Sequence, residues 1–206
     1  MQQSKRQDTR TALVKSAERL IAEKGLGSVS VKMITTAAGA RNPSAVHYHF
    51  GSIESLIKEV FAERYREIEE NRAVLLTKVA ENDPQKRVVA LMEAAIAPFL
   101  ETCLEEDGRV YVSFCLQFTT DPRFDYQELI AETGPASLLV LRDELLACLK
   151  HIPLDLLISR MRHSFMIALV QASDYAKKVE AGTARPLDEA VREAANCLAA
   201  YLAAPA

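Results

Sequence analysis

Two histidines flank a tyrosine in the stretch ARNPSAVHYHFGS, which spans residues 40–52. Histidine can ligate a metal, act as a general base or contact another molecule, so His47 and His49 are the first candidates for chemistry. If the stretch is helical, side chains two residues apart point about 200° away from each other and cannot both bind one ion. Residues 43–50 contain no Asp, Glu or Cys to complete a metal or catalytic site. The pattern therefore predicts a contact surface, with no metal, cofactor or catalytic residue.

Two helices are predicted before this stretch. The first covers residues 9–24, where apolar residues recur at helical spacing and Gly25 follows as a stop signal. The second covers residues 31–38, with Ser30 as its N-cap and Gly39 at its end. These two helices must position the histidines.

The stretch itself predicts a third, short helix and the start of a fourth. Asn42 is suited to be the N-cap, Pro43 to be the first helical residue, and the helix is expected to run to Phe50. Gly51 breaks this helix, and Ser52 caps a long helix that continues to about residue 79. Two glycine-containing turns therefore isolate the third helix.

The remainder of the chain predicts further helices and no sheet. They cover about residues 85–105, 109–120, 125–150, 153–181 and 187–202, with a possible interruption at Gly134-Pro135. Alanine and leucine are abundant, and runs of strand-forming residues are scarce. We expect an all-α chain of about nine helices.

Charge is unevenly distributed along the chain. Residues 1–60 hold nine Lys and Arg against five Asp and Glu, a net charge of +4. The remaining residues hold 16 against 23, a net charge of −7. A basic head on an acidic body indicates contact with a polyanion, although chance clustering would give the same pattern.

Other features exclude several classes of protein. No apolar run approaches the roughly 18 residues of a membrane span, and the N-terminus lacks the apolar core of a signal peptide. We therefore expect a cytoplasmic protein without a membrane partner. The four cysteines are far apart in sequence, which argues against a disulfide framework or a zinc site.

Three short helices with a tight glycine-containing turn predict a helix-turn-helix unit. In such units the third helix enters the major groove of DNA, and the second contacts the backbone. Ser44, Ala45 and His47 are small or polar enough for a groove-facing surface. Val46 and Phe50 lie four residues apart on one helical face and are expected to pack on the core.

Residues from about 9 to 61 resemble the DNA-binding domain of the TetR (tetracycline-repressor) family. The resemblance is carried by SAERLIAEKG (16–25), SVSVKMITTAAG (28–39), HYHFGS (47–52) and SLIKEVF (55–61). It implies a ligand-responsive DNA-binding regulator, usually a repressor, that binds an inverted-repeat operator as a homodimer. It also implies a head of residues 1–51 and a ligand-binding and dimerisation body of residues 52–206, with 52–80 as the connecting helix.

By position in the motif, the resemblance assigns the DNA contacts, with Tyr48 and His49 gripping phosphates. The expected contact residues are Lys32, Arg41, Asn42, Ser44, Ala45, His47, Tyr48 and His49. Lys5, Arg6 and Arg10 could extend them as an N-terminal arm on DNA, or belong to a solvated tail. Of these three, Arg10 is the best placed, at the start of the first predicted helix.

Two departures from the family pattern stand out. The stretch from Gly39 to Phe50 is one residue longer than is common, so the third helix could be aimed differently. Ile53 occupies a place where a phosphate-contacting lysine is common, and we expect Ile53 to pack instead. Arg41, in the enlarged turn, could compensate.

The resemblance places an effector pocket in the body for a small apolar or amphipathic molecule. Candidate lining residues are aromatic, with Gln117 as a polar anchor: Phe99, Tyr111, Phe114, Gln117, Phe118 and Phe165. Such aromatics could equally be core residues.

The last two helices carry long apolar stripes, which the resemblance assigns to a dimer interface built as a four-helix bundle. The stripe residues are Leu157, Met161, Ala168, Ala172, Val191, Ala194, Leu198 and Leu202. Each stripe could also pack only on its own core. An alternative function is a helical carrier or enzyme that has lost DNA binding, although the sequence shows no catalytic constellation.

Overall fold

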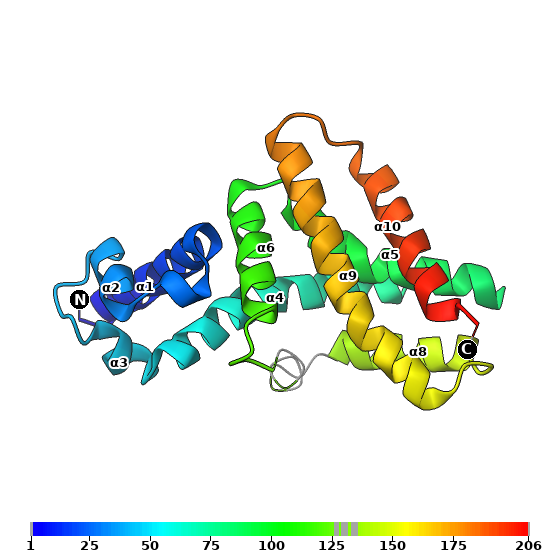
Figure 1. Ribbon diagram of the computed structural model, residues 1–206, viewed down its shortest axis with the longest axis horizontal. Helices are drawn as coiled ribbons and strands as arrows, with labels where there is room; N and C mark the ends of the chain where they lie inside the picture. Colours follow the sequence, from blue (N-terminus) through cyan, green and yellow to red (C-terminus); the bar gives the residue numbers. More distant parts are fainter. Residues whose placement is uncertain (1, 126–127, 129–131, 133–135, 206) are drawn as a thin grey trace.

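Three helices at the N-terminus are followed by one long helix in the computed structural model, which describes residues 2–125, 128, 132 and 136–205 (Figure 1). Their bounds are α1 (Gln2–Lys24), α2 (Val31–Ala37), α3 (Ala45–Phe50) and α4 (Ile53–Leu76), with a short 3₁₀ turn, η1 (Leu26–Ser28), after α1. We call α1 to α3 the head. It lies at one end of the molecule, and α4 leads away from it.

Helix α1 extends further toward the N-terminus than the sequence predicts. It begins at Gln2 rather than at Thr9, so the expected basic arm continues the helix. Helix α2 follows the prediction closely, because Ser30 is its N-cap and its hydroxyl accepts a hydrogen bond from the Met33 amide at 3.3 Å. The extension of α1 brings its first turns toward α3.

The start of α3 differs from the prediction. Asn42 is not the N-cap. Its side-chain oxygen accepts a hydrogen bond from the Ser44 amide at 2.9 Å and thereby closes a turn before the helix. The first helical hydrogen bond runs from the Tyr48 amide to the Ser44 carbonyl, so Pro43 and Ser44 remain in the turn. The extra residue between Gly39 and Phe50 is thus absorbed before α3 rather than within it.

Helix α4 connects the head to the rest of the molecule. Ser52 caps it as predicted, and its hydroxyl accepts a hydrogen bond from the Ser55 amide at 3.0 Å. The helix packs on α1 and α3 near its start and on later helices further along. Ile53 is partly buried against the core, as expected.

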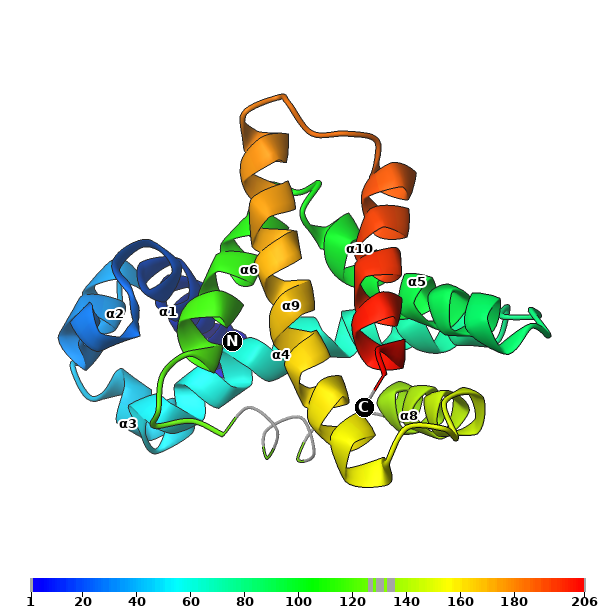
Figure 2. The ribbon, with the colours of Figure 1, turned by 45° about the vertical axis from the view of Figure 1, so that its right-hand side comes forward.

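Further helices follow α4 along the chain, and together with α4 we call them the body. They are α5 (Pro84–Thr102), α6 (Glu106–Thr119), α8 (Ala136–Cys148), α9 (Leu154–Glu180) and α10 (Leu187–Ala203). Helix α10 packs on α5 and α9, and α6 packs on both α9 and α1 (Figure 2). The described residues form nine α-helices and no strand, so the all-α prediction is confirmed. The predicted interruption at Gly134-Pro135 lies outside the described residues.

Aromatic side chains fill the core between α4 and α6. Phe61 stacks on Phe118 with ring centroids 5.7 Å apart, and Phe118 stacks on Phe114 at 5.9 Å. Tyr111 is fully buried beside them, and its hydroxyl donates a hydrogen bond to the Phe61 carbonyl at 3.0 Å. Stacked rings and a satisfied buried hydroxyl make this contact strongly stabilising.

Among the described residues, no helix is long and apolar enough to cross a membrane.

Candidate nucleic-acid interface

Helix α3 buries one side and exposes the other. Val46 is buried in the head, and Phe50 packs against Arg10 of α1. Ser44, His47 and Tyr48 are exposed, and Tyr48 is 62% exposed despite its large ring. A short helix with small and polar groups on its outer face can enter a major groove.

Two arginines of α1 lie over aromatic rings of α3. The Arg6 guanidinium lies 5.1 Å from the centre of the Tyr48 ring, and that of Arg10 lies 5.0 Å from the Phe50 ring. Arg10 also forms an ion pair with Glu59 of α4 at 2.8 Å. The first turns of α1 therefore hold the orientation of α3 relative to α4. The role of Arg6 was not evident from the sequence, because the first helix was not predicted to extend that far.

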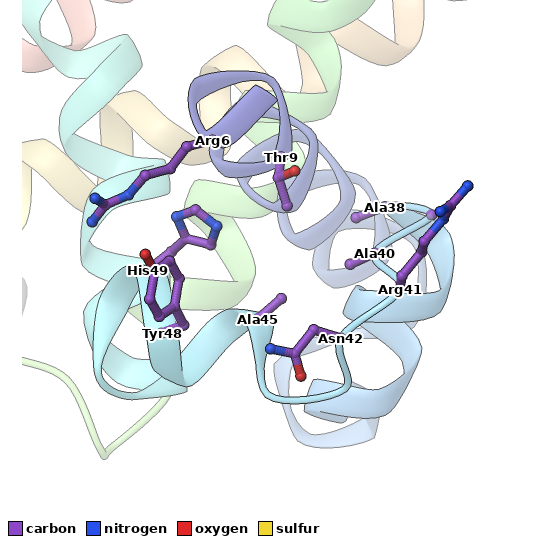
Figure 3. Close-up of a pocket in the computed structure, with 10 residues that line it drawn as sticks. Arg6, Thr9, Ala38, Ala40, Arg41, Asn42, Ala45, Tyr48 and His49 are labelled. Atoms are coloured by element: carbon purple, nitrogen blue, oxygen red, sulfur yellow. The ribbon is translucent and has the colours of Figure 1, made fainter. Parts of the chain in front are cut away.

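A cleft of about 910 Å³ opens between α1, the turn after α2 and α3 (Figure 3). Arg6, Tyr48 and His49 line one side of it, while Arg41 and Asn42 line the other. Its cations make it suited to an anionic partner such as a phosphate backbone. Arg41 and Lys32 are exposed and form no ion pair within the described part of the chain.

The two histidines have different surroundings, as the sequence predicted. His47 contacts the Gly51 carbonyl through Nδ1, which must then carry a proton. His49 faces α1, and its pKa is lowered from the ordinary value by partial burial and by the nearby charges of Arg6 and Arg10. His49 is therefore neutral in the free protein at neutral pH. No three His, Cys, Asp or Glu side chains converge as metal ligands within the described residues.

Two residues predicted to contact DNA have other roles in the structure. Ala45 is only 4% exposed, because it faces the head core rather than the outer surface. Arg10 pairs with Glu59 and covers Phe50, so its charge is already partnered. Periodicity along a six-residue helix defines its buried face poorly, and no local pattern indicates that Arg10 pairs with Glu59.

Most of the residues predicted to line an effector pocket are buried among the described core residues. Phe99, Tyr111, Phe114 and Phe118 are buried in the core, and Phe165 is half-buried. Gln117 is exposed, and its amide oxygen lies beside Gly25 at the end of α1. The aromatic run is therefore core, and Gln117 belongs to the contact between head and body.

A different cleft, of about 440 Å³, opens along α4. Tyr65 and Glu69 form its inner wall, with Lys58 and Arg66 at its edge. The buried Arg72 donates hydrogen bonds to the Tyr65 hydroxyl at 3.2 Å and to Glu69 at 2.9 Å. Ser137 of α8 donates to the same Glu69 carboxylate. This wall is polar and held by hydrogen bonds, so the cleft is suited to a small molecule with both polar and aromatic groups.

The predicted dimer residues fall into two groups. Five are buried in the core of the same chain: Leu157, Ala172, Ala194, Leu198 and Leu202. The other three, Met161, Ala168 and Val191, are half-buried. Different apolar side chains of α9 are exposed, namely Leu154, Ile158 and Val170, the last at 56%. The stripe read from the sequence is thus the face of α9 and α10 that packs on the chain's own core.

An exposed polar α3, a preceding α2 and a flanking cationic cleft give the head the arrangement of a helix-turn-helix unit. Residues 13–60 match a family model described as bacterial regulatory proteins of the tetR family. The search of curated proteins finds no match. Within residues 13–60 the resemblance to the TetR family is therefore confirmed.

Solved structures extend the similarity to the whole fold. A TetR-family transcription regulator from Marinobacter aquaeolei VT8 is 18% identical, with 98% of each chain covered and a TM-score of 0.60. NalD, the secondary repressor of the MexAB-OprM multidrug efflux pump in Pseudomonas aeruginosa, is 22% identical, with 93% of this chain and 96% of that chain covered and a TM-score of 0.57.

RolR in complex with resorcinol is 21% identical, with 93% of this chain and 95% of that chain covered and a TM-score of 0.50. The first two of these proteins are described as a transcription regulator and a repressor. The chain thus has the fold of the TetR-family transcription regulators, with the family's motif in its head.

Proposed function

We propose that this protein is a ligand-responsive transcriptional repressor that binds double-stranded DNA through α3. The observation that carries the proposal is Tyr48, a large ring exposed on the outer face of α3 and flanked by the Arg6 guanidinium. An exposed aromatic hydroxyl beside a cation is suited to a phosphate group. The match of residues 13–60 to the tetR family supports the same role.

The exposed residues divide into two kinds of contact. Lys32 and Arg41 offer charges for phosphates, and Tyr48 offers a hydroxyl. His49 lines the cleft of the head together with Arg41 and Tyr48. Ser44 and His47 are the candidates for base edges, because both are exposed at the N-terminal part of α3. Asn42 is engaged in the turn before α3 and is expected to aim the helix. Ala45 is buried and is left out of the proposed DNA contacts. Arg10 is proposed to position α3 through Phe50 and Glu59.

The functional division follows the helices. We propose that residues 1–51 read DNA and that residues 52–206 bind the effector and dimerise. Support comes from α4, which packs on α1 and α3 in its first part and on α5 and α8 in its later part. A single rigid helix that contacts both parts can transmit a change in the body to the head.

We propose that the protein acts as a homodimer through α9 and α10. Ile158 and Val170 are exposed apolar residues on α9, and exposed apolar side chains gathered on one helix often mark an interface. Met161, Ala168 and Val191 are half-buried and would lie at the margin of this face. Two heads related by a two-fold axis require an inverted-repeat operator, with half-sites about 34 Å apart or more.

The effector is proposed to be a small amphipathic molecule. The polar cleft on α4, with Tyr65 as its aromatic wall, is suited to such a ligand better than to a purely apolar one. The complex of the structurally similar RolR with resorcinol, and the part of NalD in regulating a drug efflux pump, support a small-molecule partner. Binding beside α4 would change how the head is held.

The test is a selection from a pool of randomised DNA duplexes, followed by fluorescence anisotropy. We expect inverted repeats to be enriched and to bind at least a hundredfold more tightly than scrambled duplexes. The logarithm of the affinity should fall linearly with the logarithm of salt concentration, because phosphate contacts release counterions. Failure to enrich any sequence at moderate salt would contradict the proposal.

A further inference from the structure

A carboxylate is buried where the head meets the body. Glu18 of α1 is 5% exposed, and it faces α4 and α6. Its Oε1 atom is fully covered and accepts no hydrogen bond within the described residues. The nearest cation is Arg64 of α4, with Nε 3.5 Å from this oxygen. Burying a carboxylate oxygen without a hydrogen bond raises the free energy of the folded state. The presence of such an oxygen can therefore indicate a functional role.

The partner of this carboxylate is shared. Arg64 also forms an ion pair with Asp107 of α6, at 3.4 Å. One guanidinium thus joins a residue of the head to a residue of the body. Asp107 is more than half exposed, so water solvates its carboxylate. The Arg64 guanidinium can therefore pair more closely with either of the two carboxylates. Arg64 is consequently one positive charge shared by two carboxylates, Glu18 of α1 and Asp107 of α6.

Other groups around Glu18 set its protonation. Burial is the largest effect and raises the pKa of Glu18 to about 7, while Arg64 lowers the pKa and Asp107 raises it. Glu63 of α4 raises it further, and Lys15 of α1 lowers it.

Two ionisable groups of α6 also lie near this site. Burial raises the pKa values of Tyr111 and Cys115 well above their ordinary ranges, so neither titrates near neutral pH. Glu18 is therefore the group of this junction that changes charge around neutrality.

We propose that Glu18 is a positioning residue whose protonation selects the orientation of the head on the body. This inference builds on the proposed DNA-binding function. The neutral acid favours the orientation seen in the structure, with Glu18 buried between α1, α4 and α6. The carboxylate favours an orientation of α1 that exposes it to water. Because α1 carries Arg6 and Arg10, which hold α3, movement of α1 moves the DNA-reading helix.

Proton linkage determines the direction and size of the effect. A state in which Glu18 is exposed has an ordinary carboxyl pKa and binds its proton less tightly than the buried state. Between the ordinary carboxyl pKa and the pKa of the buried state, each unit of pH therefore shifts the equilibrium up to tenfold toward the exposed state. Below this window the buried orientation is favoured most, and above it the equilibrium changes no further. A head that changes orientation with pH will change its affinity for DNA.

The experiment compares the full-length protein with Glu18→Gln, which keeps the shape and removes the titration. Glu23→Gln is the matched control, because Glu23 is exposed on the same helix. Amide hydrogen exchange is measured at pH 4.5 and pH 8.0, with all proteins compared at the same pH. Affinity for the duplex selected above is measured at both values. Asp107→Asn provides a second variant that leaves Glu18 in place.

We expect amides of α1 and α6 to exchange at similar rates in wild type and Glu18→Gln at pH 4.5. At pH 8.0 they should exchange at least threefold faster in the wild type. The ratio of the DNA affinity of the wild type to that of Glu18→Gln should change at least threefold between the two pH values. Asp107→Asn should move the transition to lower pH, because the charge of Asp107 raises the pKa of Glu18.

An exchange difference that is the same at both pH values, or absent at both, would show that Glu18 has only a packing role. An affinity ratio that stays constant while exchange changes would overturn the link to DNA. If the wild type binds no duplex at either pH, the proposed DNA-binding function fails, whereas exchange still tests the junction. If Glu18→Gln does not fold, an unmoved transition in Asp107→Asn overturns the proposal.

Discussion

At the scale of single residues, α3 shows how neighbours with similar chemistry acquire different roles. His47 lies against the Gly51 carbonyl at the end of its helix, whereas His49 faces the arginines of α1. Tyr48 projects between them with its ring largely exposed. A spacing of two residues on a helix produces this divergence, and it excludes the paired-histidine site that the sequence first raised.

The first prediction concerns the Tyr48 hydroxyl. Tyr48→Phe should weaken binding to selected and scrambled duplexes alike by about 1 kcal/mol, roughly fivefold, because a phosphate contact carries no sequence information. Fluorescence anisotropy against both duplexes measures this. A loss confined to the selected duplex would instead assign Tyr48 to base recognition, and unchanged binding would remove it from the interface.

The second prediction concerns His49 and pH. The pKa of His49 is lowered in the free protein, and a DNA phosphate in the cleft would stabilise the imidazolium and raise that pKa. Binding would then take up a proton, so affinity should increase as the pH falls. His49→Gln should flatten this part of the pH dependence, while His151→Gln, at an exposed position in the turn after α8, should not. Equal slopes in all three proteins would contradict the assignment.

At the scale of elements, the order and bounds of most helices follow from local signals. Ser30 and Ser52 cap α2 and α4 through hydrogen bonds that the sequence predicts. The start of α3 was misjudged because Asn42 can close a turn as readily as it caps a helix. The N-terminal extension of α1 was missed because residues 2–8 are polar, and polar residues give no apolar periodicity.

The third prediction follows from the packing of α1 on α4 and α6. In the folded protein the pKa of Glu18 is about 7, above its ordinary value, so the folded state holds a proton that the unfolded state releases. Stability due to this group is complete below the ordinary carboxyl pKa and is lost as the pH rises toward 7. The total loss is about 3 kcal/mol by linkage.

Glu18→Gln should lack this loss, and its melting temperature relative to wild type should increase between pH 4.5 and pH 8. Glu23→Gln should follow the wild type throughout. A constant difference between Glu18→Gln and wild type would argue that Glu18 has an ordinary pKa. Thermal unfolding by circular dichroism at matched ionic strength provides the measurement.

At the scale of the whole molecule, the exposed side chains of α9 decide the proposed assembly. Val170→Asp would place a charge on the exposed apolar surface of α9, where a dimer contact would desolvate it without a partner. We expect the dimer to dissociate and the affinity for the inverted repeat to fall at least tenfold. Val74→Asp is the control, because Val74 is equally exposed and apolar but lies on α4.

Analytical ultracentrifugation measures the mass of both variants. A monomeric wild type would overturn the dimer proposal, and a dimeric Val170→Asp would move the interface elsewhere. Single-site binding by the Val170→Asp monomer should remain, with the salt dependence of one head, because α9 lies away from α3 (Figure 1).

The sequence by itself determined the order of most helices and the motif of the head. Caps, glycine turns and apolar periodicity act within a few residues of one another, and the motif of the head lies in one continuous segment. Only the tertiary structure decided which faces remain open. Periodicity shows that a helix buries a face, but it does not show whether that face meets its own chain or a second one. Burial of Ala45, the partner of Arg10, the aromatic core and the shared charge at Glu18 all depend on helices far apart in sequence, and their contacts form only when the chain folds.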